Sequence, residues 1–335
     1  MKARIAAVEY ALAEGVLTNA QLAADHPDWK VEKIGAVTGF QARRIAGPRE
    51  YTSTIATRAA TKLFDVHEID RASVDYVILC TQSPDFALPT TACLVQAELG
   101  LRNDIGAIDI NLGCSGYIYA LGLAKGLIET GQVNTVLVLT AETHSKLSNP
   151  ADKSTRPIFG DAAAATLVVA GEKEASLTGF VLGTDGRGGP SLLVPNGGMR
   201  PGESFSPPSS VKDRALASNG YDMYMDGLEI FNFTLREVPQ CVDSVLEKAG
   251  ISHDDIDLYV FHQANLYLIE HLRKKLGIPA EKFVVSLREY GNTGSSTIPI
   301  ALADAISAGR VVEGTRIMLV GFGVGLSWGG VVATW

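Results

Sequence analysis

The stretch "IDINLGCSGYIYALG", residues 108–122, passes from an alternating apolar segment into a Gly-Cys-Ser-Gly turn and then into a long apolar run. No charge interrupts that run before Lys125. This order predicts a strand, a tight turn and a helix. Because the helix is apolar on nearly all sides, we expect it to be buried between two sheets. A cysteine at the seam between the strand and the helix is therefore a candidate for a reactive group.

The same order recurs in the second part of the chain. "DYVILC" (75–80) matches "DLYVFH" (257–262), and Asn292 stands 178 residues after Cys114 at the equivalent seam. The remaining matches are helix ends at 98–100 and 275–277, strands 106–111 and 283–289, helix ends at Gly131 and Gly309, and strands 135–140 and 316–321. A repeat of whole units predicts two similar α/β halves, residues 1–175 and 176–335.

The strands are rich in Val, Ile and Leu and alternate with helices, which is typical of mixed or parallel sheets covered by helices. Between the halves, residues 186–210 are rich in Gly, Pro and Ser, so we expect a long loop at or over a cleft. Residues 317–335 carry no charge and are long enough to span a bilayer. Five glycines divide that segment, however, and favour two buried strands joined by a tight turn.

Composition narrows the class of protein. The 335 residues are 46% hydrophobic and 20% charged, as in a soluble globular protein, and the net charge of −8 argues against nucleic-acid binding. Glu9 and Glu14 interrupt the N-terminal apolar residues, so no signal peptide is expected. The four cysteines lack metal-binding spacing and are interpreted as reduced thiols in the cytoplasm. We expect no membrane association.

The repeat also predicts where a site would lie. In a doubled fold, matching loops from the two halves face each other across the pseudo-twofold axis. Cys114 from the first half and Asn292 from the second would then converge, and His262 would arrive at a neighbouring strand end. Symmetry alone therefore proposes a Cys-His-Asn constellation.

Cys114 is predicted to be the nucleophile. At a helix N-terminus the unpaired N–H groups and the helix dipole favour the thiolate, which is the reactive form. Cys80 and Cys93 lack these features and are interpreted as core residues, and Cys241 as a helix residue.

His262 differs from the other histidines because it ends a buried strand at the predicted cleft. The other five are interpreted as structural: His26, His67, His144, His253 and His271. Asn292 competes with a simpler interpretation, a turn asparagine that satisfies its own backbone. Two chemistries remain open for the three residues, a papain-like protease and thioester chemistry. The buried, glycine-bounded cysteine favours the second.

Several motifs resemble one family. Over nearly the full length and in family order, the chain is similar to the thiolase-like condensing enzymes, specifically β-ketoacyl-acyl-carrier-protein synthase III. The matching motifs are "TGFQARR" (38–44), "LPTTAC" (88–93), "NLGCSGYIYAL" (111–121), "FGDAAAA" (159–165), "HQAN" (262–265), "GNTGSSTIP" (291–299) and "FGVGLSWG" (322–329). The resemblance implies a thiolase-like fold with two duplicated α/β halves in a five-layer α-β-α-β-α arrangement.

The resemblance also implies a mechanism. Cys114 would take an acyl group from a thioester, and malonyl-acyl-carrier protein would lose CO2 beside it. His262 and Asn292 would stabilise the enolate oxygen, and the backbone N–H groups of Cys114 and Val324 would form the oxyanion hole. Glycine is usual at the position of Val324.

Other family positions suggest how substrates are held. Leu88 would line the partner subunit's acyl pocket, and the CoA or channel-mouth positions correspond to Lys153, Asn232 and Tyr267. Lys33 and Val37 stand where a Trp and an Arg usually hold the adenine, which weakens the case for ordinary CoA use. Lys274 and Lys275 match the basic helix that meets the acidic carrier protein, although a solvated helix face explains them equally well.

The expected function is therefore a decarboxylating condensation in fatty-acid or specialised lipid or polyketide biosynthesis. The alternative is acyl transfer to an alcohol or amine without a carbon–carbon bond, and a non-enzymatic partner subunit is disfavoured because Cys114 is present. We expect no bound cofactor or metal, acyl-CoA or acyl-carrier protein as donor, acyl carrier protein as partner, and a homodimer.

Overall fold

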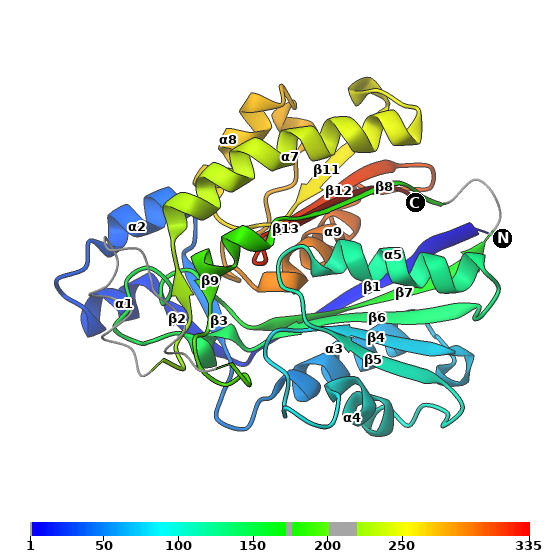
Figure 1. Cartoon of the computed structure of the whole chain (residues 1–335), viewed down its shortest axis with the longest axis horizontal. Helices are drawn as coiled ribbons and strands as arrows, with labels where there is room; N and C mark the ends of the chain where they lie inside the picture. Colours follow the sequence, from blue (N-terminus) through cyan, green and yellow to red (C-terminus); the bar gives the residue numbers. More distant parts are fainter. Residues whose placement is uncertain (1, 172–175, 201–219) are drawn as a thin grey trace.

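The computed structural model describes residues 2–171, 176–200 and 220–335. Within them, the chain forms five layers in the order helices, sheet, helices, sheet, helices (Figure 1). A smaller lobe beside these layers contains β2 (Gly15–Thr18), α1 (Asn19–Asp25), α2 (Val31–Thr38) and β3 (Ala42–Ile45). The layered architecture is that of the thiolase-like fold, as the sequence resemblance implied.

The first sheet belongs to the N-terminal part of the chain. Its order is β1 (Lys2–Leu12), β7 (Ala162–Gly171), β6 (Thr135–Glu142), β4 (Tyr76–Cys80) and β5 (Gly106–Ile110). Strands β6, β4 and β5 are parallel, whereas β7 is antiparallel to both of its neighbours. Helices α3 (Thr52–Val66) and α4 (Thr91–Glu98) cover its outer face, so it is buried on both sides.

The second sheet repeats this pattern with strands from the C-terminal part. Its order is β8 (Leu177–Thr184), β13 (Ser327–Thr334), β12 (Arg316–Gly323) and β11 (Leu258–Phe261), with β11 and β12 parallel. Helices α7 (Gly227–Ala249) and α8 (Leu266–Lys275) cover its outer face. The two sheets divide between residues 171 and 177, and the domain boundary at residue 175 stays a prediction.

Two helices fill the space between the sheets. They are α5 (Gly116–Glu129) and α9 (Thr297–Ser307), which occupy matching places in the repeat. Tyr117, Ile118 and Leu121 of α5 are fully buried, and burial of each such side chain contributes roughly 1.5–3 kcal/mol. The predicted burial of this helix is therefore confirmed, although Leu123 at the edge of the layer is half exposed.

One predicted strand is wrong. Residues 283–289 were expected to match β5, but only Phe283 forms a bridge, with Tyr259. The side chain of Gln263 takes the place of further strand pairing, since it donates to the carbonyl of Val284 (3.3 Å) and accepts from the N–H of Ser286 (2.8 Å). A side chain can thus satisfy backbone groups that a sheet would otherwise pair.

The uncharged C-terminal segment forms the predicted pair of strands. β12 and β13 are antiparallel neighbours with a three-residue connection, in register from Arg316 with Thr334 to Gly323 with Ser327. In the part of the chain that the structure describes, no helix has the length and apolar character to cross a bilayer.

The remaining described elements are short strands and 3-10 helices. They are the two-residue strands β9 (Leu192–Leu193) and β10 (Tyr224–Met225), and the 3-10 helices Arg71–Ser73, His144–Leu147, Gly186–Ser191, His253–Asp255, Ala280–Lys282 and Gly294–Ser296. The described part of the predicted loop 186–210 contributes Leu192, Leu193 and Val194 to a cavity wall. Residues 201–210 of that loop lie outside the described residues.

Candidate active site

Cys114 lies in the turn between β5 and α5, two residues before the helix begins, and is 7% exposed. The glycines around it are explained by close packing. A side chain on Gly116 would place its Cβ 2.1 Å from the sulfur of Cys80, and one on Gly323 would come within 3.0 Å of the sulfur of Cys114. The predicted strand–turn–helix seam is therefore confirmed. Gly116 in this seam leaves room for the sulfur of Cys80, and Gly323 leaves room for the sulfur of Cys114.

The backbone N–H groups of Cys114 itself and of Val324 act to lower the pKa of the Cys114 thiol. They favour the thiolate, but burial and the negative charge of Glu142 outweigh them and raise the pKa of Cys114 to about 12. The expectation of a thiolate is therefore wrong for the free enzyme. The helix start favours the thiolate, but desolvation of the buried sulfur dominates.

His262 follows β11 directly, and its ring is buried beside Phe322. Burial, with a smaller contribution from the charge of His144, lowers the pKa of His262 to about 3, so the imidazole is neutral at physiological pH. Its Nδ1 lies 2.6 Å from the hydroxyl oxygen of Thr297, the first residue of α9. That contact fixes the ring plane and leaves Nε2 as the other functional atom.

Asn292 is buried at the seam that the repeat predicted. Its backbone pairs with the segment around Phe159, through Asn292 N–H to Ile158 (2.8 Å) and Gly160 N–H to Asn292 (3.0 Å). Its side-chain oxygen accepts from the N–H of Gly294 at 3.0 Å. The turn interpretation is therefore correct for the oxygen of the amide, and the amide nitrogen remains the group that can donate to a substrate.

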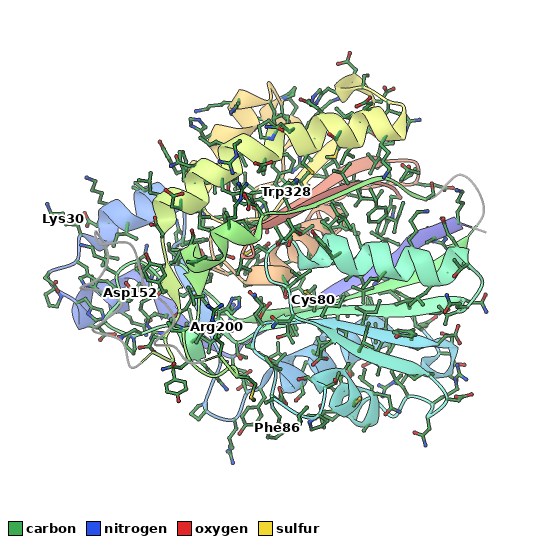
Figure 2. All side chains as sticks on the ribbon, viewed as in Figure 1. Lys30, Cys80, Phe86, Asp152, Arg200 and Trp328 are labelled. Atoms are coloured by element: carbon green, nitrogen blue, oxygen red, sulfur yellow. The ribbon has the colours of Figure 1, made fainter. Side chains whose placement is uncertain are left out.

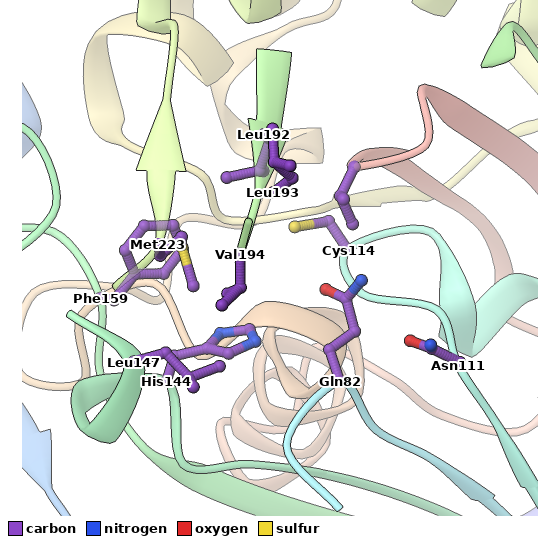
Figure 3. A pocket seen from close by; sticks show the side chains of 11 residues that line it. Gln82, Asn111, Cys114, His144, Leu147, Phe159, Leu192, Leu193, Val194 and Met223 are labelled. Atoms are coloured by element: carbon purple, nitrogen blue, oxygen red, sulfur yellow. The ribbon is translucent and has the colours of Figure 1, made fainter. Parts of the chain in front are cut away.

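A cavity of about 280 Å³ opens beside Cys114 (Figure 3). Its walls are mostly apolar, with polar groups from three side chains, and it is lined by Gln82, Asn111, Cys114, His144, Leu147, Phe159, Leu192, Leu193, Val194, Met223 and Val324. His262 and Asn292 join it through a chain of contacts. Thr297 touches His262 and donates to the carbonyl of Gly294 (3.1 Å), and Gly294 packs against His144.

His144 was interpreted as structural from the sequence, and that interpretation is incomplete because its ring lines the cavity. It begins a 3-10 helix two residues after β6, and its Nε2 lies 3.1 Å from a carboxylate oxygen of the fully buried Glu142. Burial opposes a charge on the ring, but the carboxylates of Glu142 and Asp161 raise the pKa of His144. The signal that identified His262, a histidine emerging from a buried strand, was present here too.

The residues predicted to hold substrate do not line the cavity. Leu88 is 86% exposed on the loop before α4, and Lys153 is exposed on a separate loop. Asn232 is exposed on α7, next to Phe231, whose ring stacks on Tyr267 of α8. Tyr267 therefore lies at the seam between the outer helices, in contact with the residue before Asn232, and the four substrate contacts stay predictions.

The two predicted carrier-binding lysines lie at the end of α8. Both are exposed, but the Nζ of Lys275 donates to the carbonyl of Leu235 (2.7 Å), whereas Lys274 extends from the helix. Lys274 is thus the better placed of the two for an incoming acidic surface.

The cysteines divide differently from expectation. Cys80 is fully buried in the interior (Figure 2). Cys241 is buried on α7. Cys93, predicted to be a core residue, is exposed. The buried residues of α4 are Thr91, Ala92 and Val95, which leaves Cys93 on the opposite face of this short helix.

Two α/β halves stacked on a pair of buried central helices, with a buried cysteine in the turn before one of these helices, define the thiolase-like class of condensing enzymes. Family models described as 3-oxoacyl-[acyl-carrier-protein] synthase III and its C-terminal part match residues 108–186 and 246–335. The chain belongs to the β-ketoacyl-[acyl-carrier-protein] synthase III family.

Individual relatives support this assignment over the whole chain. A β-ketoacyl-[acyl-carrier-protein] synthase III of Caldanaerobacter subterraneus is 38% identical over 97% of this chain and 95% of its own length. A crystal structure of a 3-oxoacyl-(acyl-carrier-protein) synthase III superposes with a TM-score of 0.93 at 48% identity, covering 100% of both chains. A synthase from Burkholderia xenovorans LB400 gives 0.93 at 36% identity, covering 100% of this chain and 94% of its own.

Proposed function

We propose that the protein catalyses a decarboxylating Claisen condensation between an acyl thioester and malonyl-acyl-carrier protein, in fatty-acid or specialised lipid or polyketide biosynthesis. The observation that carries this proposal is the buried thiol of Cys114, which receives two backbone N–H groups beside a largely apolar cavity. An acyl chain suits such a cavity, and its thioester carbonyl suits the two N–H groups. The names of the relatives specify the same reaction class.

In the first step, the sulfur of Cys114 attacks the carbonyl of the donor thioester. The bond from that carbonyl to the donor sulfur breaks, and the proton of the Cys114 thiol ends on the departing CoA or carrier thiol. With a pKa of about 12, the thiol does not ionise spontaneously near neutral pH, so a base must take its proton as the bond forms. We propose as base the neutral imidazole of His262 in the tautomer whose Nδ1–H donates to Oγ1 of Thr297, so that Nε2 takes the thiol proton and passes it to the departing thiol.

In the second step, the carbon–carbon bond to the malonyl carboxylate breaks and CO2 leaves. The resulting enolate oxygen would accept hydrogen bonds from Nε2 of His262 and the amide nitrogen of Asn292. The Thr297 hydroxyl has one proton and two acceptors within reach, Nδ1 of His262 at 2.6 Å and the carbonyl of Gly294 at 3.1 Å. Donation to Nδ1 would place the imidazole proton on Nε2, as this role requires.

The enolate carbon then attacks the acyl group on Cys114, forming the new carbon–carbon bond of a 3-oxoacyl product and returning the sulfur as a thiolate, which takes a proton. The cysteine, the histidine, the asparagine and the lost CO2 supply all the chemistry of this scheme, so we propose that no cofactor takes part. Acyl transfer to an alcohol or amine is not favoured, since the relatives are named as β-ketoacyl synthases.

Partners follow from the same proposal. Acyl carrier protein would dock on the exposed Lys274 side of α8, and acyl-CoA or acyl-carrier protein would be the donor. A second copy of the chain would pack on the exposed part of residues 77–92. Residues 77–80 are buried in β4, but Leu88 is 86% exposed and Phe86 is 59% exposed (Figure 2). We also propose a cytoplasmic location, which four free thiols support.

The experiment that tests the function uses malonyl-carrier protein labelled in the free carboxylate, with a panel of acyl-CoA and acyl-carrier donors. Release of labelled CO2 together with a 3-oxoacyl product is the expected result. Acyl-enzyme formation without CO2 release from any donor would reject condensation and favour the acyl-transfer alternative.

A further inference from the structure

The cavity beside Cys114 has one polar corner. Seven of its lining side chains are apolar, whereas Gln82, Asn111 and His144 bring polar groups to its wall, Gln82 and His144 from the side of β4 and β6 (Figure 3). Figure 3 shows the side chains of Gln82, His144 and Cys114 around the same space. An acyl pocket that served a plain hydrocarbon chain would gain nothing from two hydrogen-bonding groups in its wall, because each must lose water when the chain enters.

The His144 ring can form hydrogen bonds beyond those that the protein supplies. It is 2% exposed, and within the described residues neither ring nitrogen has a hydrogen-bond partner of good geometry. The contact of its Nε2 with Glu142 at 3.1 Å is an ion pair with poor hydrogen-bond alignment. Buried polar nitrogens without partners are uncommon and need an explanation, for which a ligand is one source.

Glu142 is, by contrast, fully engaged. Its carboxylate accepts from the hydroxyl of Ser295 (2.8 Å), the backbone N–H of Gln82 (3.0 Å) and the hydroxyl of Ser83 (3.2 Å). Asp161 fixes the same segment from the other side, by accepting from the N–H of Ser145 at 2.8 Å. The imidazole is therefore held by its neighbours in a rigid frame, with Nε2 in the ion pair to Glu142 and Nδ1 as the nitrogen that stays available.

We propose that His144, assisted by Gln82, binds an oxygen atom on the acyl chain carried by Cys114, so that the preferred acyl group bears a hydroxyl, oxo or carboxylate substituent. This inference rests on the proposed function, because it presumes that the chain enters the cavity from an acyl-Cys114. His144 donates to the oxygen, and the cavity walls on the side of Leu192 and Val194 hold the carbon chain. His144 is then a specificity-determining residue of the acylation step.

The size of the effect follows from the unpaired donor. An unsubstituted chain dehydrates His144 without replacing its hydrogen bonds, and sites built to bind a polar group reject analogues that lack it. We expect acylation of Cys114 by an oxygen-bearing donor to exceed that by its unsubstituted match roughly tenfold or more.

The test measures acylation of the full-length enzyme by intact mass, with each acyl group supplied on CoA and on carrier protein. Three pairs separate the kind of oxygen: 3-hydroxybutanoyl against butanoyl, succinyl against butanoyl, and glutaryl against pentanoyl. His144→Leu should abolish the preference and speed acylation by the unsubstituted donors, while His144→Gln, which keeps a donor, should retain part of it. His67→Leu, the same change at a partly exposed position on the far end of α3, should leave the preference intact.

Two results would overturn the inference. One is equal or faster acylation by the unsubstituted donor in every pair. The other is that His144→Leu alters only the KM for malonyl-carrier protein and not the acylation rates. His144 and Gln82 would then contact the malonyl unit and not the acyl chain. Absence of any acyl-enzyme, with all donors, would instead reject the proposed function, so the two failures are distinguishable.

Discussion

Nδ1 of His262 lies 2.6 Å from Oγ1 of Thr297, which links the residue after β11 to the first residue of α9. The contact joins a catalytic candidate to a hydroxyl that also reaches the carbonyl of Gly294. The direction in which the Thr297 hydroxyl donates its proton therefore influences whether Nδ1 or Nε2 of His262 carries the imidazole proton.

Thr297→Ala should slow CO2 release about tenfold or more, because the Nε2–H form of His262 loses its support. Acylation of Cys114 should change less. Single-turnover assays of the two half-reactions provide the measurement, and Thr297→Ser should restore the rate because it keeps the hydroxyl. Equal losses in both half-reactions, without recovery in the serine variant, would indicate a merely structural role.

Asn292→Ala should spare acyl-enzyme formation and block decarboxylation, by roughly a hundredfold or more, since the amide donates only to the enolate. Cys114→Ala, by comparison, should abolish the acyl-enzyme altogether. Intact mass and labelled CO2 report the two steps separately. If Asn292→Ala also prevented acylation, the division of roles between the two residues would be wrong.

The reactivity of Cys114 should rise with pH without reaching a plateau in the ordinary range. Its pKa of about 12 lies above the ordinary thiol value, so below that pH the thiolate fraction, and with it the alkylation rate, grows about tenfold per pH unit. Iodoacetamide labelling of the Cys114 peptide between pH 7 and 10 provides the measurement, and the exposed Cys93 serves as an internal control. A plateau near pH 8 would show that the thiol is activated in the free enzyme.

Gly116→Ala should destabilise the fold by about 1–3 kcal/mol, because the added methyl would lie 2.1 Å from the sulfur of Cys80. Urea unfolding measures the loss in free energy. In a Cys80→Ala background the same change should be less destabilising, since the sulfur is gone. If the losses in the free energy of unfolding from the two substitutions were strictly additive, the predicted clash between the methyl added by Gly116→Ala and the Cys80 sulfur would be wrong.

Lys274→Glu should raise the KM for malonyl-carrier protein several-fold and leave that for malonyl-CoA nearly unchanged, because the charge meets the carrier surface rather than the thioester. Lys248→Glu on α7 makes the same change in net charge at another exposed helix end. If both substitutions raised the KM for malonyl-carrier protein equally, Lys274 would act only through its contribution to the net charge and not by direct contact with the carrier.

The repeat made most of the fold predictable, since strand, turn and helix recur with nearly constant spacing and the periodic apolar patterns are strong. It failed at residues 283–289, where the side chain of Gln263 replaces strand pairing, an arrangement that no pattern of hydrophobicity encodes. It also misplaced Cys93, because α4 is short and only weakly amphipathic.

For the site, the sequence led to the positions of Cys114, His262 and Asn292, but electrostatics could not be inferred from order along the chain. The sum of desolvation and the charge of Glu142 at Cys114 depends on three-dimensional burial. His144 was missed for a different reason. His144 follows the buried strand β6 and lines the cavity together with Cys114, so the pattern that identifies His262 applies to it as well.

The small ladder of β9 and β10 pairs Leu192 with Met225 and Leu193 with Tyr224, and Leu192 and Leu193 also line the cavity. The ladder thus holds one wall of the cavity from two segments that are far apart along the chain. Exchange of Leu192 or Leu193 would therefore change the space open to an acyl group while Cys114, His262 and Asn292, which lie on other elements, keep their places.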